Sequence, residues 1–314
     1  MKQKVRINFV DFWPPNTREG ILRNPLYKIL SHRFDLELVE KPDFLLYSNV
    51  GKRFLKYNCV RIYYEGENIR PNFDECDYSF GYDYPINDRG YRLPLYRLYF
   101  SLFDELRRRR LGDDDYPRGE RKFCNFLYTK NAQDRTAFFH QLQAYKPVDS
   151  GGRLLNNLGY RVEDTLDFMR QYKFSISFEN GCYPGYTTEK IEQALVARTV
   201  PIYWGNPLID LDFNPEAFIN CHDYDSFEDV IERVREVDAN DDLYHAYLEA
   251  SPFPNNAIND SVKEENILDR FEQIFSNPRT ERAAKPIDIC RYYAQPLAKR
   301  IRKCRKVVGG LLTR

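Results

Sequence analysis

The sequence contains no long apolar run. No window approaches the ~20 consecutive apolar residues that a membrane-spanning helix needs. The N-terminal stretch MKQKVRINFVDFWPPN has too short an apolar segment for a signal peptide. We therefore expect neither a transmembrane helix nor a secretion signal.

Paired cysteine motifs are also absent. The seven cysteines lie far apart, with no Cys-x-x-Cys pair and no cluster of Cys and His. This spacing argues against a zinc site and against a redox-active pair. The odd number and the missing disulfide framework favour a reducing compartment, so we expect a cytoplasmic location. The cysteines are Cys59, Cys76, Cys124, Cys182, Cys221, Cys290 and Cys304.

The chain has no net charge, because 47 basic residues balance 47 acidic ones. The balance is uneven, since no acidic residue follows Asp288 whereas eight Lys and Arg residues do. Apolar residues recur among these charges at helical spacing, at Leu297, Ile301, Cys304, Val308 and Leu311. This basic amphipathic pattern favours contact with an anionic membrane surface through residues 291–314. A solvated tail is the alternative, and nucleic-acid binding is disfavoured because no aromatic platform accompanies the charges.

The length of 314 residues suits two domains. We place the first at residues 1–122, the second at 123–280 and the basic tail at 281–314. In the first, short apolar runs alternate with helical patterns, which predicts a parallel α/β sheet. The expected strands are Val5–Val10, Leu36–Val39, Phe44–Tyr47 and Val60–Tyr64, and the expected helices are Ile21–Phe34 and Ser101–Arg110.

A polar stretch, residues 112–122, separates the two domains. Its three consecutive aspartates, Asp113–Asp115, resemble the acidic metal-binding motif of one class of glycosyltransferases. That motif would have to lie at a strand end in a nucleotide site. We favour a solvated linker, because runs of like charge are usually exposed.

The second domain shows the clearer pattern of alternating strands and helices. We expect a last helix, Glu265–Ser276, to close this domain. The other expected elements are strands at Phe123–Tyr128, Lys173–Phe178 and Thr199–Trp204, and helices at Arg135–Tyr145, Val162–Tyr172, Glu189–Arg198 and from Ser226 to about Val237.

The segment FSISFENGCYPGYTTEKIEQALVARTVPIYWG, residues 174–205, carries most of the functional information. It is typical of one βαβ unit. Its loop, Glu179–Thr188, follows a strand, where ligands bind in open parallel sheets, and leads into a helix that Thr187 or Thr188 can cap. A helix N-terminus suits phosphate, and Lys190 in the first turn would add a cation. From spacing alone, an ordinary capped helix with a surface lysine remains the alternative.

These residues resemble the α-1,3/1,4-fucosyltransferases, glycosyltransferase family ten, especially bacterial members that build Lewis-type antigens. The resemblance rests on FEN, TEK and VPIYWG, and it extends through PLIDLDFNPEAFINCHDYDSFED. Upstream it includes NAQDRTAFFHQL, VDSGGRLLNNLGY and VRIYYEGENIRPNFDECDYSFGYDY. It covers roughly residues 5 to 250.

The resemblance implies an α/β GT-B fold, in which two Rossmann-like domains face each other across a cleft. It implies inverting transfer of L-fucose from GDP-fucose to a GlcNAc hydroxyl of a LacNAc or Lewis-type glycan, most directly O3. Glu67 matches the catalytic base. The matched donor-binding positions are Arg135, Asn180, Tyr186, Glu189 and Lys190, of which Arg135 and Lys190 match cations for the diphosphate.

Three more residues are candidates on chemical grounds. Glu65 points the same way along the strand as Glu67 and is the rival base, although either carboxylate can instead simply cap a turn. Glu179 either stabilises an oxocarbenium-like transition state or orients its loop. Trp13 either stacks on an acceptor sugar or fills a loop.

We predict no obligatory metal or cofactor, because Arg135 and Lys190 can neutralise the leaving diphosphate. The expected partners are GDP-fucose, a LacNAc-type acceptor and the inner face of a membrane, without nucleic acid. Two alternatives remain: a related enzyme with another sugar nucleotide or acceptor, and a non-catalytic glycan-binding module of the same fold.

Overall fold

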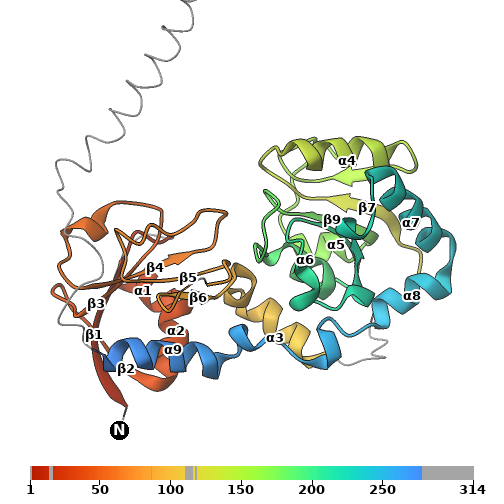
Figure 1. The fold of residues 1–314 in the computed structure, drawn as a ribbon. Coiled ribbons are helices and arrows are strands. Elements are labelled where there is room, and N and C mark those ends of the chain that lie inside the picture. The colour runs from red at the N-terminus through yellow and green to blue at the C-terminus, as the bar shows by residue number, and fades with distance from the viewer. Residues whose placement is uncertain (1, 14–16, 86, 110–115, 117–118, 278–314) are drawn as a thin grey trace, which may run out of the picture.

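A computed structural model describes residues 2–13, 17–85, 87–109, 116 and 119–277 (Figure 1). The aspartate run and the basic tail of the sequence analysis lie outside these described residues. Two α/β domains stand side by side, and helix α3 (Phe100–Arg108) lies between them. Within the described residues, no helix has the length and apolar character to cross a bilayer.

The first domain is built on a parallel sheet with the strand order β2-β1-β3-β4-β5-β6. Its central strand is buried on both faces, as expected for a parallel sheet covered on both sides. Phe44 and Leu46 face one apolar cluster, whereas Leu45 and Tyr47 face another. The strands described are β1 (Gln3–Val10), β2 (Phe34–Leu38), β3 (Phe44–Tyr47), β4 (Val60–Glu65), β5 (Tyr78–Gly81) and β6 (Gly90–Arg92).

Two helices replace the single helix expected over Ile21–Phe34. They are α1 (Arg18–Arg23) and α2 (Pro25–Arg33). Asn24 has an extended backbone (ψ 129°) and its side chain caps α2, because the residue before a proline is pushed out of the helical region. The apolar periodicity continues across the break, which is why the sequence pattern alone did not reveal it.

The second domain is a parallel sheet with the order β11-β10-β9-β7-β8. Helices α4, α7 and α8 cover one face, and α6 packs with α3 on the other. The strands described are β7 (Lys122–Phe126), β8 (Val148–Ser150), β9 (Tyr172–Phe178), β10 (Val200–Trp204) and β11 (Ile219–Asn220). The helices are α4 (Gln133–Gln143), α5 (Thr165–Met169), α6 (Glu189–Val196), α7 (Phe227–Ala239) and α8 (Asp241–Glu249).

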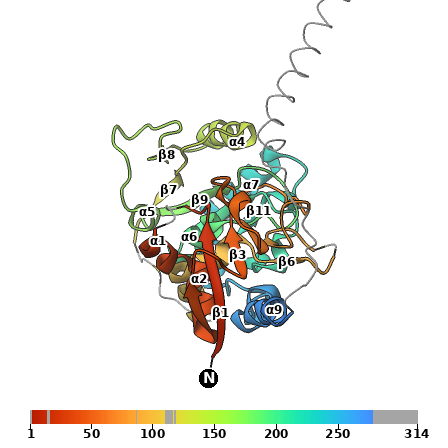
Figure 2. The same ribbon diagram turned by 90° about the vertical axis from the view of Figure 1, so that its left-hand side faces the viewer.

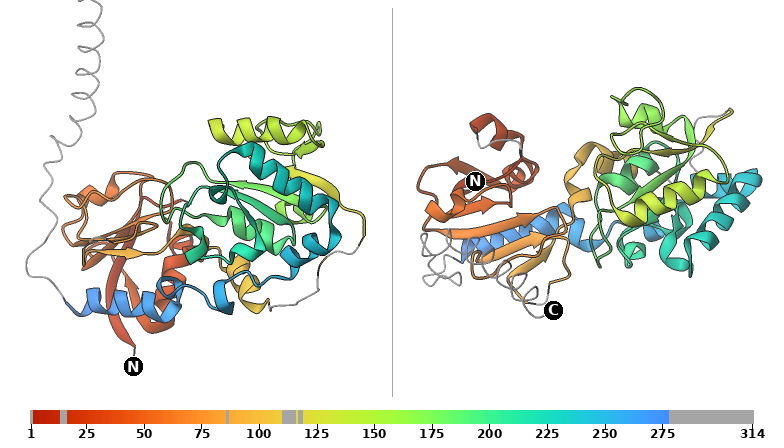
Figure 3. Two further views of the ribbon diagram at one scale, coloured as in Figure 1. Left: turned by 45° about the vertical axis from the view of Figure 1, so that its right-hand side comes forward. Right: turned by 90° about the horizontal axis from the view of Figure 1, so that it is seen from above.

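The last described helix, α9 (Glu264–Ser276), differs from the sequence expectation. It was expected to close the second domain, but it packs under the first sheet (Figures 2 and 3). Phe271 stacks on Phe80 with ring centroids 4.3 Å apart, and Phe275 lies 4.7 Å from Phe44. The amphipathic pattern predicts an apolar face but does not say which sheet that face covers.

A buried ion pair joins the two domains. Arg92, at the end of β6, donates to Asp212 of the second domain at 2.9 Å, and the two side chains are 4% and 0% exposed. Tyr96 donates to the same carboxylate at 3.2 Å. The predicted α/β architecture with two facing Rossmann-like domains is therefore confirmed, and this pair fixes where the domains meet.

Helix α6 carries a carboxyl group on its buried face. Glu192 is fully buried, and neither of its oxygens has a hydrogen-bond partner within the described part of the chain. Burial, with a smaller contribution from Glu189, raises the pKa of Glu192 well above its usual value. The folded protein therefore holds a proton that the unfolded chain releases, so stability falls as the pH rises above about 4.5.

Replacing Glu192 by leucine should stabilise the protein. We expect a gain of about 1–3 kcal/mol, the cost of one unpaired buried polar group. The gain should be larger at pH 8 than at pH 5, because the proton that the folded protein holds on Glu192 is released more completely by the unfolded chain at the higher pH. Thermal unfolding at the two pH values measures it, with exposed Glu105→Leu on α3 as the control. A melting temperature that is unchanged or lowered at pH 8 would contradict this reading.

Candidate active site

The loop between β9 and α6 forms the floor of the candidate site. It leaves the carboxyl end of β9, and Thr188 is the extended N-cap of α6. In the described residues, no protein acceptor is found for the backbone N–H groups of Glu189 and Lys190. Free N–H groups at the positive end of a helix dipole form an anion-binding site.

Glu179 holds Lys190 in position at this helix end. Lys190 Nζ lies 3.0 Å from Glu179 Oε2 and 2.7 Å from Thr188 Oγ1. Glu179 is fully buried and also accepts from the Thr188 N–H at 2.7 Å. Although burial lowers the pKa of Lys190, Glu179 and Glu189 more than offset it and raise that pKa above its ordinary value. Lys190 is therefore charged, but the neighbouring carboxylates of Glu179 and Glu189 partly neutralise its positive charge.

Gly205, after β10, makes room for Glu179. It has φ +153°, and a Cβ there would stand 2.5 Å from the Glu179 side chain. Such a distance is too short for any side chain, so only glycine fits. The VPIYWG motif thus ends in a glycine because the carboxylate of the FEN motif packs directly against it.

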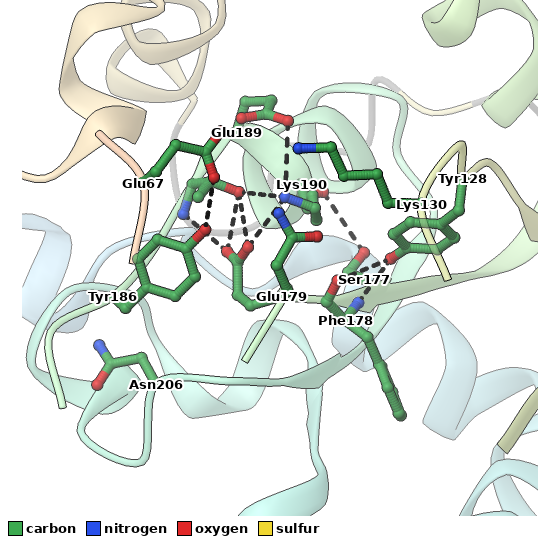
Figure 4. Close-up of polar contacts among 12 residues, drawn as sticks. Glu67, Tyr128, Lys130, Ser177, Phe178, Glu179, Tyr186, Glu189, Lys190 and Asn206 are labelled. Carbon is green, nitrogen blue, oxygen red and sulfur yellow. Dashed lines mark hydrogen bonds and ion pairs between the residues drawn. The ribbon is translucent and has the colours of Figure 1, made fainter. Parts of the chain in front are cut away.

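Glu67 enters the site from the first domain, on the turn after β4. Its carboxylate is exposed, and Oε2 accepts from Tyr186 Oη across the domain junction at 3.5 Å. Figure 4 shows Glu67 facing the side chains of Tyr186, Glu189 and Lys190. The structure thus brings Glu67 and four of the second-domain candidates, Tyr186, Glu179, Glu189 and Lys190, to one place.

Glu65 holds the Glu67 turn rather than entering the site. It is 3% exposed, and its Oε1 accepts from the backbone N–H of Glu67 at 2.7 Å. Tyr63 Oη and Asn49 Nδ2 donate to the same carboxylate. Burial raises the pKa of Glu65, and the hydrogen bonds from Tyr63 and from the Glu67 N–H oppose the rise. The oxygens of Glu65 are thus engaged inside the protein, where they support the turn that carries Glu67.

Arg135 lies beneath the loop instead of at the surface of the site. It is 1% exposed and its ring-stacked guanidinium lies 3.8 Å above Tyr128. One nitrogen, Nη2, donates to the backbone oxygens of Phe178 and Glu179 and to the exposed Asn180 Oδ1, at 2.9–3.0 Å. Contact with a diphosphate would require these bonds to be exchanged. In this state Arg135 shapes the loop after β9.

Trp13 stands apart from this group. Its side chain is 82% exposed after β1, and among the described residues it makes no hydrogen bond or ring contact with the other candidates. The structure thus leaves both roles considered for Trp13 without a contact to support them.

Sequence reasoning missed a third cation, Lys130. It lies in the loop after β7, its backbone oxygen accepts from Arg135 at 2.9 Å, and its side chain is exposed. Figure 4 shows the amino group extending toward Lys190 and Glu189. No motif pointed to Lys130, because an isolated lysine in a polar loop is indistinguishable from a solvated one.

Asn206 was also missed, although it follows the recognised motif directly. It is fully buried and accepts from the Gly185 N–H at 2.7 Å while donating to Thr187 at 3.0 Å. Gly185 has φ +85°, and a Cβ there would stand 2.3 Å from the Tyr82 carbonyl oxygen of the first domain. These contacts fix the loop 183–188 at the junction, where Tyr186 meets Glu67.

Among the described residues, no three His, Cys, Asp or Glu side chains are grouped so as to hold a metal ion. The site therefore consists of a carboxylate from one domain that faces a cationic helix N-terminus from the other. Together with the paired parallel sheets, this arrangement defines a GT-B-like glycosyltransferase.

Comparisons with known proteins identify the family. Residues 7–99 match the model of the alpha-(1,3)-fucosyltransferase FucT N-terminal domain, and residues 120–268 match the C-terminal model of glycosyltransferase family 10 (fucosyltransferase). The alpha-(1,3)-fucosyltransferase FucT of Helicobacter pylori is 31% identical over 93% of this chain and 70% of its own length. The chain therefore belongs to the fucosyltransferases of glycosyltransferase family 10, as its motifs predict.

Solved structures agree with this assignment. A crystal structure of an alpha1,3-fucosyltransferase matches with a TM-score of 0.79 and 29% identity, over 92% of this chain and 94% of that one. A crystal structure of alpha1,3-fucosyltransferase with GDP-fucose matches with a TM-score of 0.75 and 29% identity, over 90% and 93% of the two chains.

Proposed function

We propose that this protein transfers L-fucose from GDP-fucose, with inversion, to O3 of GlcNAc in a LacNAc or Lewis-type glycan. The observation that carries the proposal is the placement of Glu67 against Tyr186, beside Lys190 at the start of α6. The relatives with GDP-fucose in their structures support the choice of donor.

The donor diphosphate binds at the N-terminus of α6. The free N–H groups of Glu189 and Lys190 donate hydrogen bonds to its oxygens, and Lys190 supplies a charge that Glu179 keeps in place. Because Glu179 and Glu189 offset Lys190, the site needs another cation. Lys130 supplies it, whereas Arg135 acts through the loop that it braces.

Glu67 acts as the general base. Its carboxylate takes the proton of the acceptor hydroxyl while that oxygen forms a bond to C1 of fucose. The bond from C1 to the phosphate oxygen breaks, and GDP leaves with its electron pair. Lys190, Lys130 and the helix N–H groups stabilise the added negative charge. The exposure of Glu67 supports this role, because an acceptor hydroxyl can reach its carboxylate. The rival base Glu65 is buried, and both of its oxygens already accept hydrogen bonds inside the protein.

Glu179 is proposed as a positioning residue rather than a partner of the sugar. Its oxygens already accept from Thr188 and Lys190 inside the protein. Stabilisation of an oxocarbenium-like transition state would therefore come from the leaving diphosphate and the charges around it.

Replacing Glu67 by glutamine should lower transfer about 10²–10⁴-fold, the usual contribution of a general base. GDP affinity should stay unchanged, because Glu67 does not contact the diphosphate. The assay follows GDP release from GDP-fucose with type 1 and type 2 disaccharides, and linkage analysis of the product identifies the hydroxyl. Full activity of this variant would overturn the role of Glu67. Product from another hydroxyl or another sugar nucleotide would correct the acceptor or the donor.

Substitutions of Lys130 and Arg135 should have different effects, the first on GDP affinity and the second on stability. Lys130→Met should weaken GDP binding about tenfold, the value of one charge-assisted contact, without changing the melting temperature. Arg135→Met should lower stability by about 2–4 kcal/mol, because buried carbonyl groups lose their donor. Calorimetric titration and thermal unfolding measure both. If Lys130→Met binds GDP at low salt as tightly as the wild type does, Lys130 does not contact the diphosphate.

We further propose, from the sequence, that the protein is cytoplasmic and attaches to the inner face of a membrane, where lipopolysaccharide-type acceptors are built. Residues 291–314 of the basic tail, outside the described residues, would provide the attachment. The full chain should bind anionic vesicles, and a chain ending at residue 280 should bind them several-fold less. Binding should weaken with salt, since each basic residue adds ~1 kcal/mol near the surface. If both chains sediment equally with the vesicles, the tail does not provide the membrane attachment.

A further inference from the structure

Two loops meet at the domain junction, one after β4 in the first domain and one after β9 in the second, and they touch at two places. Glu67 of the first loop meets Tyr186 of the second. Three residues later in the first loop, Arg70 meets Tyr183, which lies three residues earlier in the second. The loops therefore pass each other in opposite directions, with one contact at the proposed base and one beside it.

The contact between Glu67 and Tyr186 is too weak to hold the two loops together. Their oxygens lie 3.5 Å apart, whereas O–H···O hydrogen bonds usually measure roughly 2.5–3.0 Å. Glu67 is also exposed, so water competes for its carboxylate. The pair of Arg92 and Asp212 fixes the domains at the end of β6, not the loop after β4. The distance between the loops must therefore be set by another contact.

Arg70 makes that contact, and it uses both sides of its guanidinium. Nη1 donates to the Tyr183 hydroxyl, and the guanidinium carbon lies 5.1 Å from the centre of the same ring. A charged donor and a cation over an aromatic face both attract. On the other side, Nε donates to Asp83 at 2.9 Å, and the Asp83 side chain is only 20% exposed. One planar group thus joins the loop after β5 to the second domain.

Tyr82 links the two contacts. Its ring packs edge-on against Tyr183 and Tyr186, with centroids 5.5 and 5.2 Å apart. Its hydroxyl donates to Asn68 Oδ1 at 3.0 Å, in the loop that carries the proposed base. The backbone N–H of Tyr186 also donates to the Tyr183 oxygen at 3.1 Å. A displacement of Tyr183 would therefore be passed on to Tyr186.

We propose that Arg70 is a positioning residue for the transfer reaction, because its bond to Tyr183 holds the turn of Glu67 at a fixed distance from the β9–α6 loop. The proposal rests on the proposed function, since it takes Glu67 as the base. Position matters, because a shift of about 1 Å at a reacting group can lower the rate about 10²-fold. Arg70 acts on the rate only through Glu67, and GDP binding at the start of α6 does not depend on it.

Arg70→Met and Arg70→Lys test the proposal. Each should lower kcat about tenfold or more, whereas the KM for GDP-fucose and the affinity for GDP should stay unchanged. The melting temperature should also hold, because an exposed ion pair adds little stability. Lysine should not restore the rate, since a point charge does not reproduce the fork of the guanidinium. Arg6→Met, which removes an exposed pair with Asp43 before β3, is the control and should leave kcat unchanged.

A double variant separates positioning from other effects on the rate. If Arg70 acts through Glu67, Arg70→Met should cause no further loss in the Glu67→Gln background, because interacting sites are not additive. An equal loss in both backgrounds, or full activity of either Arg70 variant, would overturn the proposal and leave the proposed function standing. Full activity of Glu67→Gln would overturn both.

Amide hydrogen exchange tests the same contact without turnover. Residues 66–73 and 181–186 should exchange faster in Arg70→Met than in the wild type, because opening of the loops no longer breaks the bond to Tyr183. Tyr183→Phe, which keeps the ring but removes the hydroxyl, should show a smaller increase, and Arg6→Met none. Unchanged exchange of both loops in Arg70→Met would overturn the proposal whatever the activity of the wild type.

Discussion

The buried ion pair between Arg92 and Asp212 is the contact on which the geometry of the site depends. A buried pair gives little net stability, because desolvating two charges offsets their attraction. It does fix orientation, since separating the partners would leave a charge unpaired inside the protein. Arg92 ends the last strand of the first sheet, and Asp212 lies just beyond α6 and β10 of the second domain. The pair therefore sets how Glu67 faces Lys190.

Around this junction, the buried charged residues of the site each have defined partners. Glu179 positions Lys190, Glu65 positions the Glu67 turn, and Arg135 supports the loop between them. Preorganised groups of this kind stabilise developing charge without rearranging during the reaction. The exposed carboxylate of Glu67 and the exposed amino group of Lys130 remain for substrate, so the groups that are free are those that the proposed chemistry uses.

Much of this could be predicted from the sequence because motif and local geometry coincide. The parallel strands, the helix that begins at Glu189 and the meeting of Glu67 with Tyr186 all follow from residues within recognisable motifs, whereas the expected threonine cap does not form, because the Thr188 hydroxyl bonds Glu179 and Lys190. The sequence could not show that Glu65 and Arg135 are buried, since their roles depend on tertiary hydrogen bonds. Lys130 was missed for the opposite reason, because its significance comes only from its neighbours in space. The sheet that α9 covers was likewise invisible, since an apolar helix face is compatible with either one.

The return of α9 to the first sheet has a consequence for biosynthesis. Strand β6 ends at Arg92, whereas α9 begins only at Glu264, about 170 residues later. At roughly 5–20 residues per second, the ribosome needs about 10–35 s to make that stretch. During this interval the first domain lacks α9, so Phe44 and Phe80 are not yet covered by it. The core of the second domain, in contrast, is built from its own strands and helices. The lobe made first is thus the lobe completed last, and nascent chains are most exposed to chaperones and aggregation at the first sheet.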